Sequence, residues 1–190
     1  MQMIPYEKHR DHLRAMLRTH SVKRGEFVLA SGETSTVYVD VRLTALRAEA
    51  TPLIGNTFIE KMQSRGWMPD AIGGLTMGAD PIVTAISRES LEHGLSIDGF
   101  LVRKEAKGHG RQQYIEGLPE TGVQQVIIVE DVCTTGGSAL TAVKHARNAK
   151  LEILGVIALV DREQGGGAAI EAAGCPFERI FTMSELLTES

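Results

Sequence analysis

The chain of 190 residues is poor in aromatic residues and carries no excess of positive charge. Aromatic residues make up 5% of it, which excludes an aromatic-rich platform for single-stranded nucleic acid. Its 20 basic residues against 24 acidic ones give a net charge of -4, so we expect no nucleic-acid partner. No apolar run approaches the roughly 20 residues that a membrane span needs. We therefore expect neither a signal peptide nor a membrane partner.

Cysteine is also scarce. Cys133 and Cys175 stand 42 positions apart without a CxxC pair or a flanking histidine, so the sequence indicates neither a zinc site nor a disulfide framework. A reduced cytoplasmic protein is expected. The length and the 43% hydrophobic content suit one domain over 1–190. We expect its N-terminal cap to cover about 1–45 and its core about 46–190.

The core pattern alternates apolar strand-like runs with helical segments. Strands are expected at 70–75, 100–102, 126–129, 153–160 and 177–181, and helices at 53–62, 81–91 and 138–148. Continuous apolar runs separated by helices predict an α/β fold, a parallel sheet flanked by helices. A helix over 6–19 and a hairpin of 27–30 with 37–41 would form the cap. Ligands bind beyond the carboxyl ends of such strands, here near Gly73, Arg103 and Glu130.

The strongest motif follows the run at 126–129. Glu130 and Asp131 are succeeded by a loop of hydroxyl residues and glycines, Thr134 to Ser138, which opens onto a helix. Backbone N–H groups at a helix start can hold a phosphate. The two carboxylates would repel a phosphate but suit vicinal sugar hydroxyls or a divalent ion. The motif therefore predicts a site for a phosphorylated ribose; the alternative is an ordinary connection between a strand and a helix.

A basic segment follows the run at 100–102. Arg103, Lys104, Lys107, His109 and Arg111 place up to five cations within nine residues that glycines interrupt. Such an arm can close over a diphosphate. The alternative is a solvated charged loop, which is the usual reading of a charge run.

Three blocks of the sequence resemble the type I phosphoribosyltransferase family and, within it, the orotate phosphoribosyltransferases. The block at 126–138 resembles the motif for phosphoribosyl diphosphate (PRPP), RKEAKGHG at 103–110 resembles the flexible loop, and DREQGG at 161–166 resembles the segment after the next strand. The resemblance covers about 15–190 and implies that family's fold, with a small N-terminal hood. It implies transfer of the phosphoribosyl group from PRPP to orotate in pyrimidine biosynthesis, giving orotidine 5′-monophosphate and diphosphate.

The resemblance also implies residue roles. Asp131, Lys104 and Lys107 are implied to be catalytic, and Thr134 and Arg162 to bind orotate. Residues implied to contact PRPP are Arg103, Lys104, Lys107, His109, Glu130, Asp131, Val132, Cys133, Thr134, Thr135, Gly136, Gly137 and Ser138. Mg²⁺, held mainly by PRPP, is the implied cofactor. A homodimer whose flexible loop reaches into the neighbouring site is the implied assembly.

The chain departs from the family pattern at two positions. Many members carry lysine where this chain has Ala30 and Met77, so two cations expected near PRPP are missing. A neighbouring arginine such as Arg42 would fill the gap.

Two other functions compete with this prediction. One is a relative that uses a purine base, against which Lys107 to Gly110 and Arg162 favour orotate. The other is a nucleotide-sensing regulator that binds nucleic acid. It would need an added DNA-binding helix pair or a basic face, and the net charge of -4 argues against it.

Overall fold

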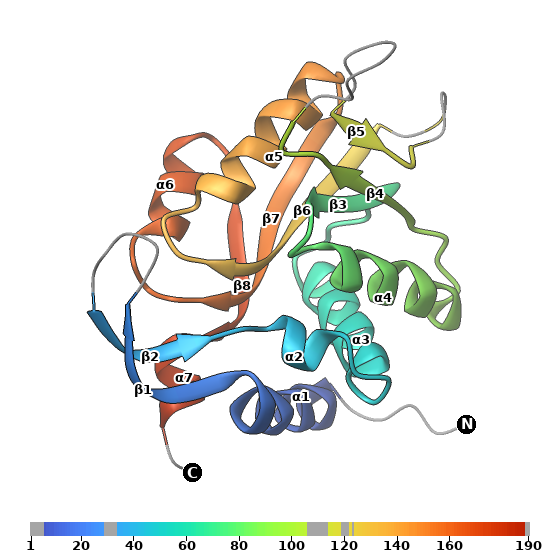
Figure 1. The fold of residues 1–190 in the computed structure, drawn as a ribbon. Helices are drawn as coiled ribbons and strands as arrows, with labels where there is room; N and C mark the ends of the chain where they lie inside the picture. The colour runs from blue at the N-terminus through green and yellow to red at the C-terminus, as the bar shows by residue number, and fades with distance from the viewer. Residues whose placement is uncertain (1–5, 29–33, 106–113, 119–121, 123, 189–190) are drawn as a thin grey trace.

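A computed structural model describes residues 6–28, 34–105, 114–118, 122 and 124–188. Its centre is a six-stranded sheet in the order β5-β4-β3-β6-β7-β8 (Figure 1). Five strands are parallel, and β5 joins the edge antiparallel to β4. The strands are β3 (Ala71–Leu75), β4 (Asp98–Val102), β5 (Ile115–Glu116), β6 (Gln125–Cys133), β7 (Glu152–Asp161) and β8 (Phe177–Thr182).

The central strands are buried on both faces, as their continuous apolar runs predict. Along β6, Ile127 and Val129 belong to one hydrophobic cluster and Val126 and Ile128 to the other. Alternate side chains of a strand point to opposite faces, so this strand needs a core on each side.

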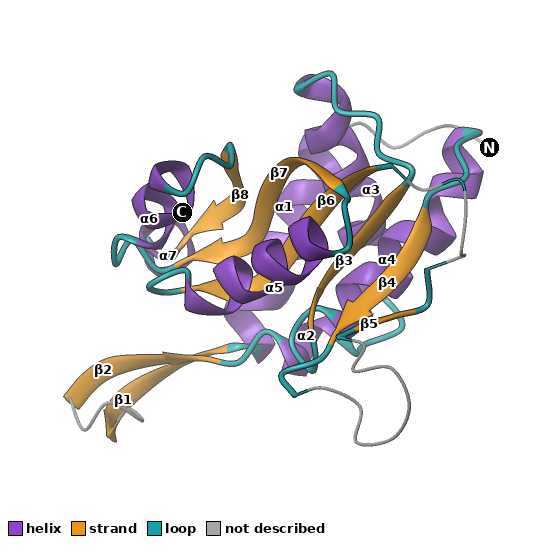
Figure 2. Cartoon of the chain, turned by 90° about the horizontal axis from the view of Figure 1, so that it is seen from above, coloured by secondary structure: helices purple, strands orange, loops and turns teal. Residues whose placement is uncertain are grey.

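Helices supply those two cores (Figure 2). On one face lie α5 (Gly137–Asn148) and α6 (Gly166–Ala172), and on the other lie α3 (Ala50–Ser64) and α4 (Asp80–Ser90), which continues into the short η1 (Leu91–His93). The predicted α/β architecture, a parallel sheet flanked by helices, is thereby confirmed.

The N-terminal part stands beside the sheet. It comprises α1 (Tyr6–His20), β1 (Val22–Val28), β2 (Thr34–Val39) and the short α2 (Arg42–Ala45). The two strands form their own antiparallel sheet, which projects away from the core in Figure 2. The hairpin begins earlier than the sequence indicates. Its first strand is exposed and contains the polar Lys23 and Glu26, so it lacks the apolar run from which a strand is predicted.

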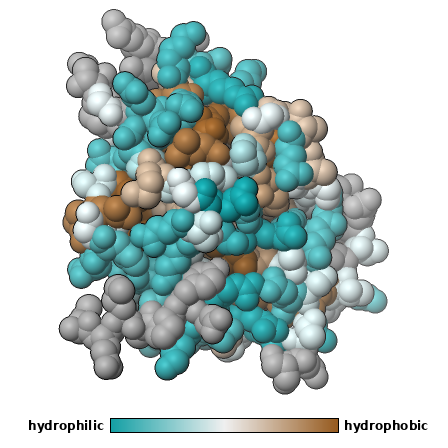
Figure 3. All heavy atoms as spheres, turned by 180° about the vertical axis from the view of Figure 1, so that it is seen from behind, coloured by the Kyte–Doolittle hydropathy of each residue, from teal (hydrophilic) through white to brown (hydrophobic). Residues whose placement is uncertain are grey.

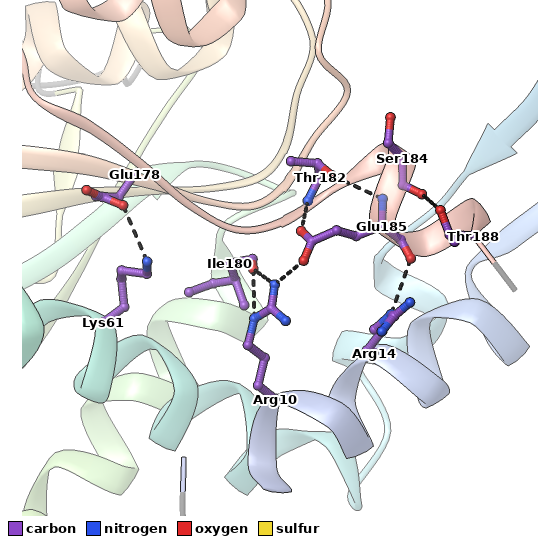
Figure 4. Close-up of polar contacts among 9 residues, drawn as sticks. All are labelled: Arg10, Arg14, Lys61, Glu178, Ile180, Thr182, Ser184, Glu185 and Thr188. Carbon is purple, nitrogen blue, oxygen red and sulfur yellow. Dashed lines mark hydrogen bonds and ion pairs between the residues drawn. The ribbon is translucent and has the colours of Figure 1, made fainter. Parts of the chain in front are cut away.

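Contacts with the C-terminal segment fasten α1 to the core (Figure 4). The Arg10 guanidinium donates to the carbonyl of Ile180 at 2.9 Å and to Glu185 Oε1 at 2.6 Å. It also lies 4.6 Å from the centre of the Phe181 ring. Glu185 and Thr182 form a capping box at the start of α7 (Met183–Leu187).

Several short elements were not expected from the sequence. The helices α2 and α6 and the two-residue strand β5 are too short to show a periodic pattern.

No helix within the described residues has both the length and the apolarity to cross a membrane. The face seen in Figure 3 mixes polar side chains with separate apolar areas.

Candidate active site

A cavity of about 200 Å³ opens where β3, β4 and β6 end. It lies at the edge of the sheet where ligands of such folds bind. Its described lining residues come from three strand ends, from α2 and from the start of α5: Arg42, Leu75, Thr76, Met77, Gly78, Lys104, Glu130, Asp131 and Ser138.

The predicted acidic pair lies in this cavity, with a different environment for each member. Glu130 is 6% exposed. Burial, followed by the charge of Asp131, raises the pKa of Glu130 to about 8. Asp131 is partly exposed, and its Oδ1 accepts a hydrogen bond from the Val132 N–H at 2.8 Å. At neutral pH, Glu130 is therefore largely protonated before a ligand binds and can donate a hydrogen bond to a hydroxyl.

The predicted phosphate loop leads from β6 into α5. Gly136 adopts a left-handed conformation with φ of 82° at the start of α5, and no side chain caps this helix end. Backbone N–H groups of a first helical turn lack partners within the helix. Thr135 and Ser138 are exposed beside them. The loop can therefore offer backbone and hydroxyl donors to a phosphate.

Cys133 within this stretch is buried, with 1% of its surface exposed. Burial, followed by the charges of Asp161 and Glu130, raises the pKa of its thiol to about 11. The helix start beside it therefore does not activate this thiol. A PRPP contact at Cys133 would have to use its backbone.

The turn between β3 and α4 forms another wall. Its peptide bond between Thr76 and Met77 is cis. The Thr76 hydroxyl donates to Asp80 Oδ1 at 2.8 Å and fastens the turn to α4. This turn places Gly78 against the Asp131 side chain.

The basic segment is only partly described. Lys104 lines the cavity. The neighbouring Arg103 pairs with Glu116 of β5, with Nη1 and Oε1 3.4 Å apart. Lys107, His109 and Arg111 lie outside the described residues.

Arg162 lies beside the phosphate loop, at the end of β7. Its backbone N–H donates to the carbonyl of Cys133 at 2.9 Å. Its side-chain Nε is buried and has no hydrogen-bond partner among the described residues. A buried guanidinium N–H needs an acceptor, and a carboxylate would supply one.

The two departures from the family pattern differ in what the structure says of them. Ala30 lies outside the described residues. Met77 lines the cavity and is 71% exposed. Because methionine is uncharged, this position supplies no cation to the cavity. Arg42 lines the cavity although it belongs to no predicted motif. Arg42 was foreseen only as a neighbouring positive charge.

The chain is similar to known proteins over most of its length. The family described as "Phosphoribosyl transferase domain" matches residues 46–173. The orotate phosphoribosyltransferase of Synechocystis sp. is 40% identical over 186 residues, 98% of this chain and 92% of that protein. The crystal structure of Mycobacterium tuberculosis H37Rv orotate phosphoribosyltransferase with Fe(III) dicitrate has a TM-score of 0.82 and 41% identity, covering 95% of this chain and 99% of that chain. The M. tuberculosis enzyme with PRPP has a TM-score of 0.77 and 38% identity, covering 94% and 98%.

Proposed function

Because the chain belongs to the orotate phosphoribosyltransferase family, it transfers the phosphoribosyl group of PRPP to orotate, and we propose that it does so in the cavity at the ends of β3, β4 and β6. One observation carries this location. Lys104 is distant in sequence from the block that runs from Glu130 to Ser138, yet Lys104, the Glu130–Asp131 pair and Ser138 line one cavity. They combine a cation, two sugar-binding carboxyl groups and a phosphate-binding helix start.

The proposed roles follow from the charges that the reaction creates. When the bond between ribose C1 and the diphosphate oxygen breaks, its electron pair leaves with the diphosphate, and positive charge develops on the ribose ring. Orotate N1 then forms the new bond to C1, and the proton that N1 carried is released to solvent. Glu130 and Asp131 would hold the ribose hydroxyls, with Asp131 close to the cationic ring. Lys104, and Arg103, Lys107 and His109 of the basic segment, would stabilise the departing diphosphate.

The remaining proposed contacts use the two loops beside the acidic pair. Val132 and Cys133 would meet PRPP through their backbone, and Thr134 to Ser138 would hold its 5′-phosphate. Arg162, with its unpartnered buried Nε, would bind the orotate carboxylate beside Thr134.

Mg²⁺ is the proposed cofactor. Two carboxyl groups line the cavity, but the described residues contain no cluster of three or more His, Cys, Asp or Glu side chains that would hold a metal. This donor set fits an ion held mainly by the oxygens of PRPP, with Glu130 and Asp131 nearby. Bound there, Mg²⁺ would neutralise negative charge on the diphosphate.

We also propose one domain over 1–190, a homodimer with shared sites and a cytoplasmic location. The dimer is proposed from the resemblance of the basic segment to a loop that reaches the neighbouring subunit. The location is proposed from the two free, buried thiols, Cys133 and Cys175.

One assay tests the function. PRPP and Mg²⁺ are supplied with orotate, adenine, hypoxanthine or uracil separately, and consumption of each base is followed. We expect orotate alone to be consumed, and chelation of the metal to stop the reaction. Consumption of a purine with orotate left intact would overturn the assignment.

A further inference from the structure

The walls of the active-site cavity bear two cations among the described residues, and one comes from outside the predicted motifs. Lys104 belongs to the basic segment, and Arg42 belongs to α2 of the N-terminal part. Figure 2 shows α2 at the edge of the sheet where β3 and β4 end. The N-terminal part therefore contributes a charged side chain to a site that the core otherwise builds.

Asp40 fixes the orientation of this arginine. Arg42 Nε donates to Asp40 Oδ1 at 2.9 Å, and Arg42 Nη2 donates to Oδ2 at 3.1 Å. The backbone N–H of Arg42 also donates to Oδ1, at 3.1 Å. This two-point contact defines the plane of the guanidinium. No described residue accepts a hydrogen bond from Nη1, and Arg42 lines the cavity.

The Arg42 guanidinium also interacts electrostatically with Asp131, which lines the same cavity. The side chain of Asp40 and, more weakly, the charge of Asp131 raise the pKa of Arg42. The group is therefore a permanent cation that faces the carboxylate proposed to hold the ribose. Its side chain is 46% exposed, so a ligand can reach it from the cavity.

We propose that Arg42 binds the diphosphate of PRPP and partly replaces the cation that Met77 does not provide. This inference rests on the proposed function. Thr76, Met77 and Gly78 of the turn after β3 line the cavity with Arg42 and Lys104, whereas Arg162, the proposed orotate ligand, does not. Arg42 therefore lies on the PRPP side of the site. A guanidinium also suits phosphate oxygens, because the Nη1–Nη2 edge of the planar group still has N–H groups to donate while Asp40 holds the Nε–Nη2 edge.

The experiment measures binding of inorganic diphosphate with Mg²⁺ by calorimetry, and KM for PRPP and for orotate. We expect Arg42→Ala to weaken diphosphate binding about ten-fold or more and to raise KM for PRPP similarly. KM for orotate should change less than about two-fold, because the inference assigns Arg42 to the diphosphate and not to orotate. Arg42→Gln tests the same loss of charge with less loss of side-chain volume, should Arg42→Ala fail to fold.

Two further variants separate binding from structure. Arg47→Ala removes an exposed arginine near α2 that does not line the cavity, and it should match the parent. Asp40→Asn should weaken diphosphate binding by less than Arg42→Ala, because the charge remains but its orientation is lost.

The inference is overturned if Arg42→Ala and Arg42→Gln, folded by circular dichroism, bind diphosphate as tightly as Arg47→Ala. A rise in KM for orotate without one for PRPP overturns it as well. If either result is obtained and the parent protein still converts PRPP and orotate, the proposed function stands and only the role of Arg42 is overturned. A parent that consumes no PRPP contradicts the proposed function instead.

Discussion

Gly78 lies directly against Asp131 at the wall of the proposed active-site cavity. A methyl group on Gly78 would lie 2.5 Å from Oδ1 of Asp131 and 2.7 Å from its Cγ. Atoms in a packed protein do not approach so closely without displacement. The absence of a side chain at this turn therefore allows the Asp131 carboxylate its position beside the proposed ribose site.

Gly78→Ala should displace the Asp131 carboxylate and lower activity more than stability. We expect kcat/KM for PRPP to fall about ten-fold or more, because small misplacements of a catalytic group are costly. Because the clash meets the end of a side chain, Tm should change little. The combined variant Gly78→Ala with Asp131→Asn should be no less active than Asp131→Asn alone. If the losses of activity in the two single variants add in the combined variant, Gly78 affects activity through a residue other than Asp131.

Asp131→Asn should slow the chemical step and leave the fold intact. Asparagine can still accept the hydrogen bond from the Val132 N–H, but it carries no charge beside the developing ribose cation. We expect kcat to fall about 100-fold, measured at saturating substrates. Asp98→Asn is a matched control, because Asp98 is an exposed carboxylate at the opposite end of the sheet. Full activity in Asp131→Asn would contradict the proposed role of the acidic pair.

Glu130→Gln should become more stable relative to the parent as the pH rises. Folding raises the pKa of Glu130 from 4.5 to about 8, so between these values the folded protein binds more protons than the unfolded chain. The stability linked to this proton is complete at lower pH and is lost as the pH approaches 8. Glutamine does not titrate. The Tm of the variant minus that of the parent should therefore grow from about pH 5 to about pH 9.

The comparison is made by thermal unfolding without substrates, in buffers of equal ionic strength. A Tm difference that is constant across this range, or that shrinks as the pH rises, would contradict the raised pKa of Glu130.

Arg10→Ala should destabilise the contact between α1 and the C-terminal segment. The substitution removes the hydrogen bonds to Ile180 and Glu185 and the contact with the Phe181 ring. We expect a loss of about 1–3 kcal/mol in the free energy of unfolding, measured by urea titration. Arg14→Ala is the control, because its Nε makes one hydrogen bond there, at 3.2 Å to the Glu185 carbonyl. Equal losses of unfolding free energy in the two variants would mean that the additional contacts of Arg10 do not stabilise the protein more than the single hydrogen bond of Arg14.

The proposed shared sites predict recovery of activity in mixed subunits. Lys107→Ala and Asp131→Asn subunits should each be nearly inactive alone. In a mixed dimer, one site would hold both intact groups, so some activity should return. Recovery is measured after subunit exchange has been confirmed with differently tagged chains. If exchange occurs and activity stays absent, each chain closes its own site.

The sequence predicted the sheet because its strands bear a pattern that few other structures satisfy. Val126 to Val129 is apolar at every position, so both faces of that strand must be covered. The helical segments on either side of it in the sequence provide the residues that cover them. The acidic pair and the glycine-rich loop follow this strand directly. Their proximity is a local property of the chain, and the site at this strand end could be predicted for that reason.

Tertiary structure decided which other residues join that site. Arg42, Gly78 and Lys104 are far from Glu130 in sequence, and their positions depend on how the N-terminal part and the turn after β3 pack against the sheet. The protonation of Glu130 follows from burial, which no spacing of residues specifies. Local patterns therefore determined the sheet and the type of ligand. Packing between distant segments determined the charge and the full lining of the cavity, because electrostatic interactions depend on distance through space and on exclusion of water.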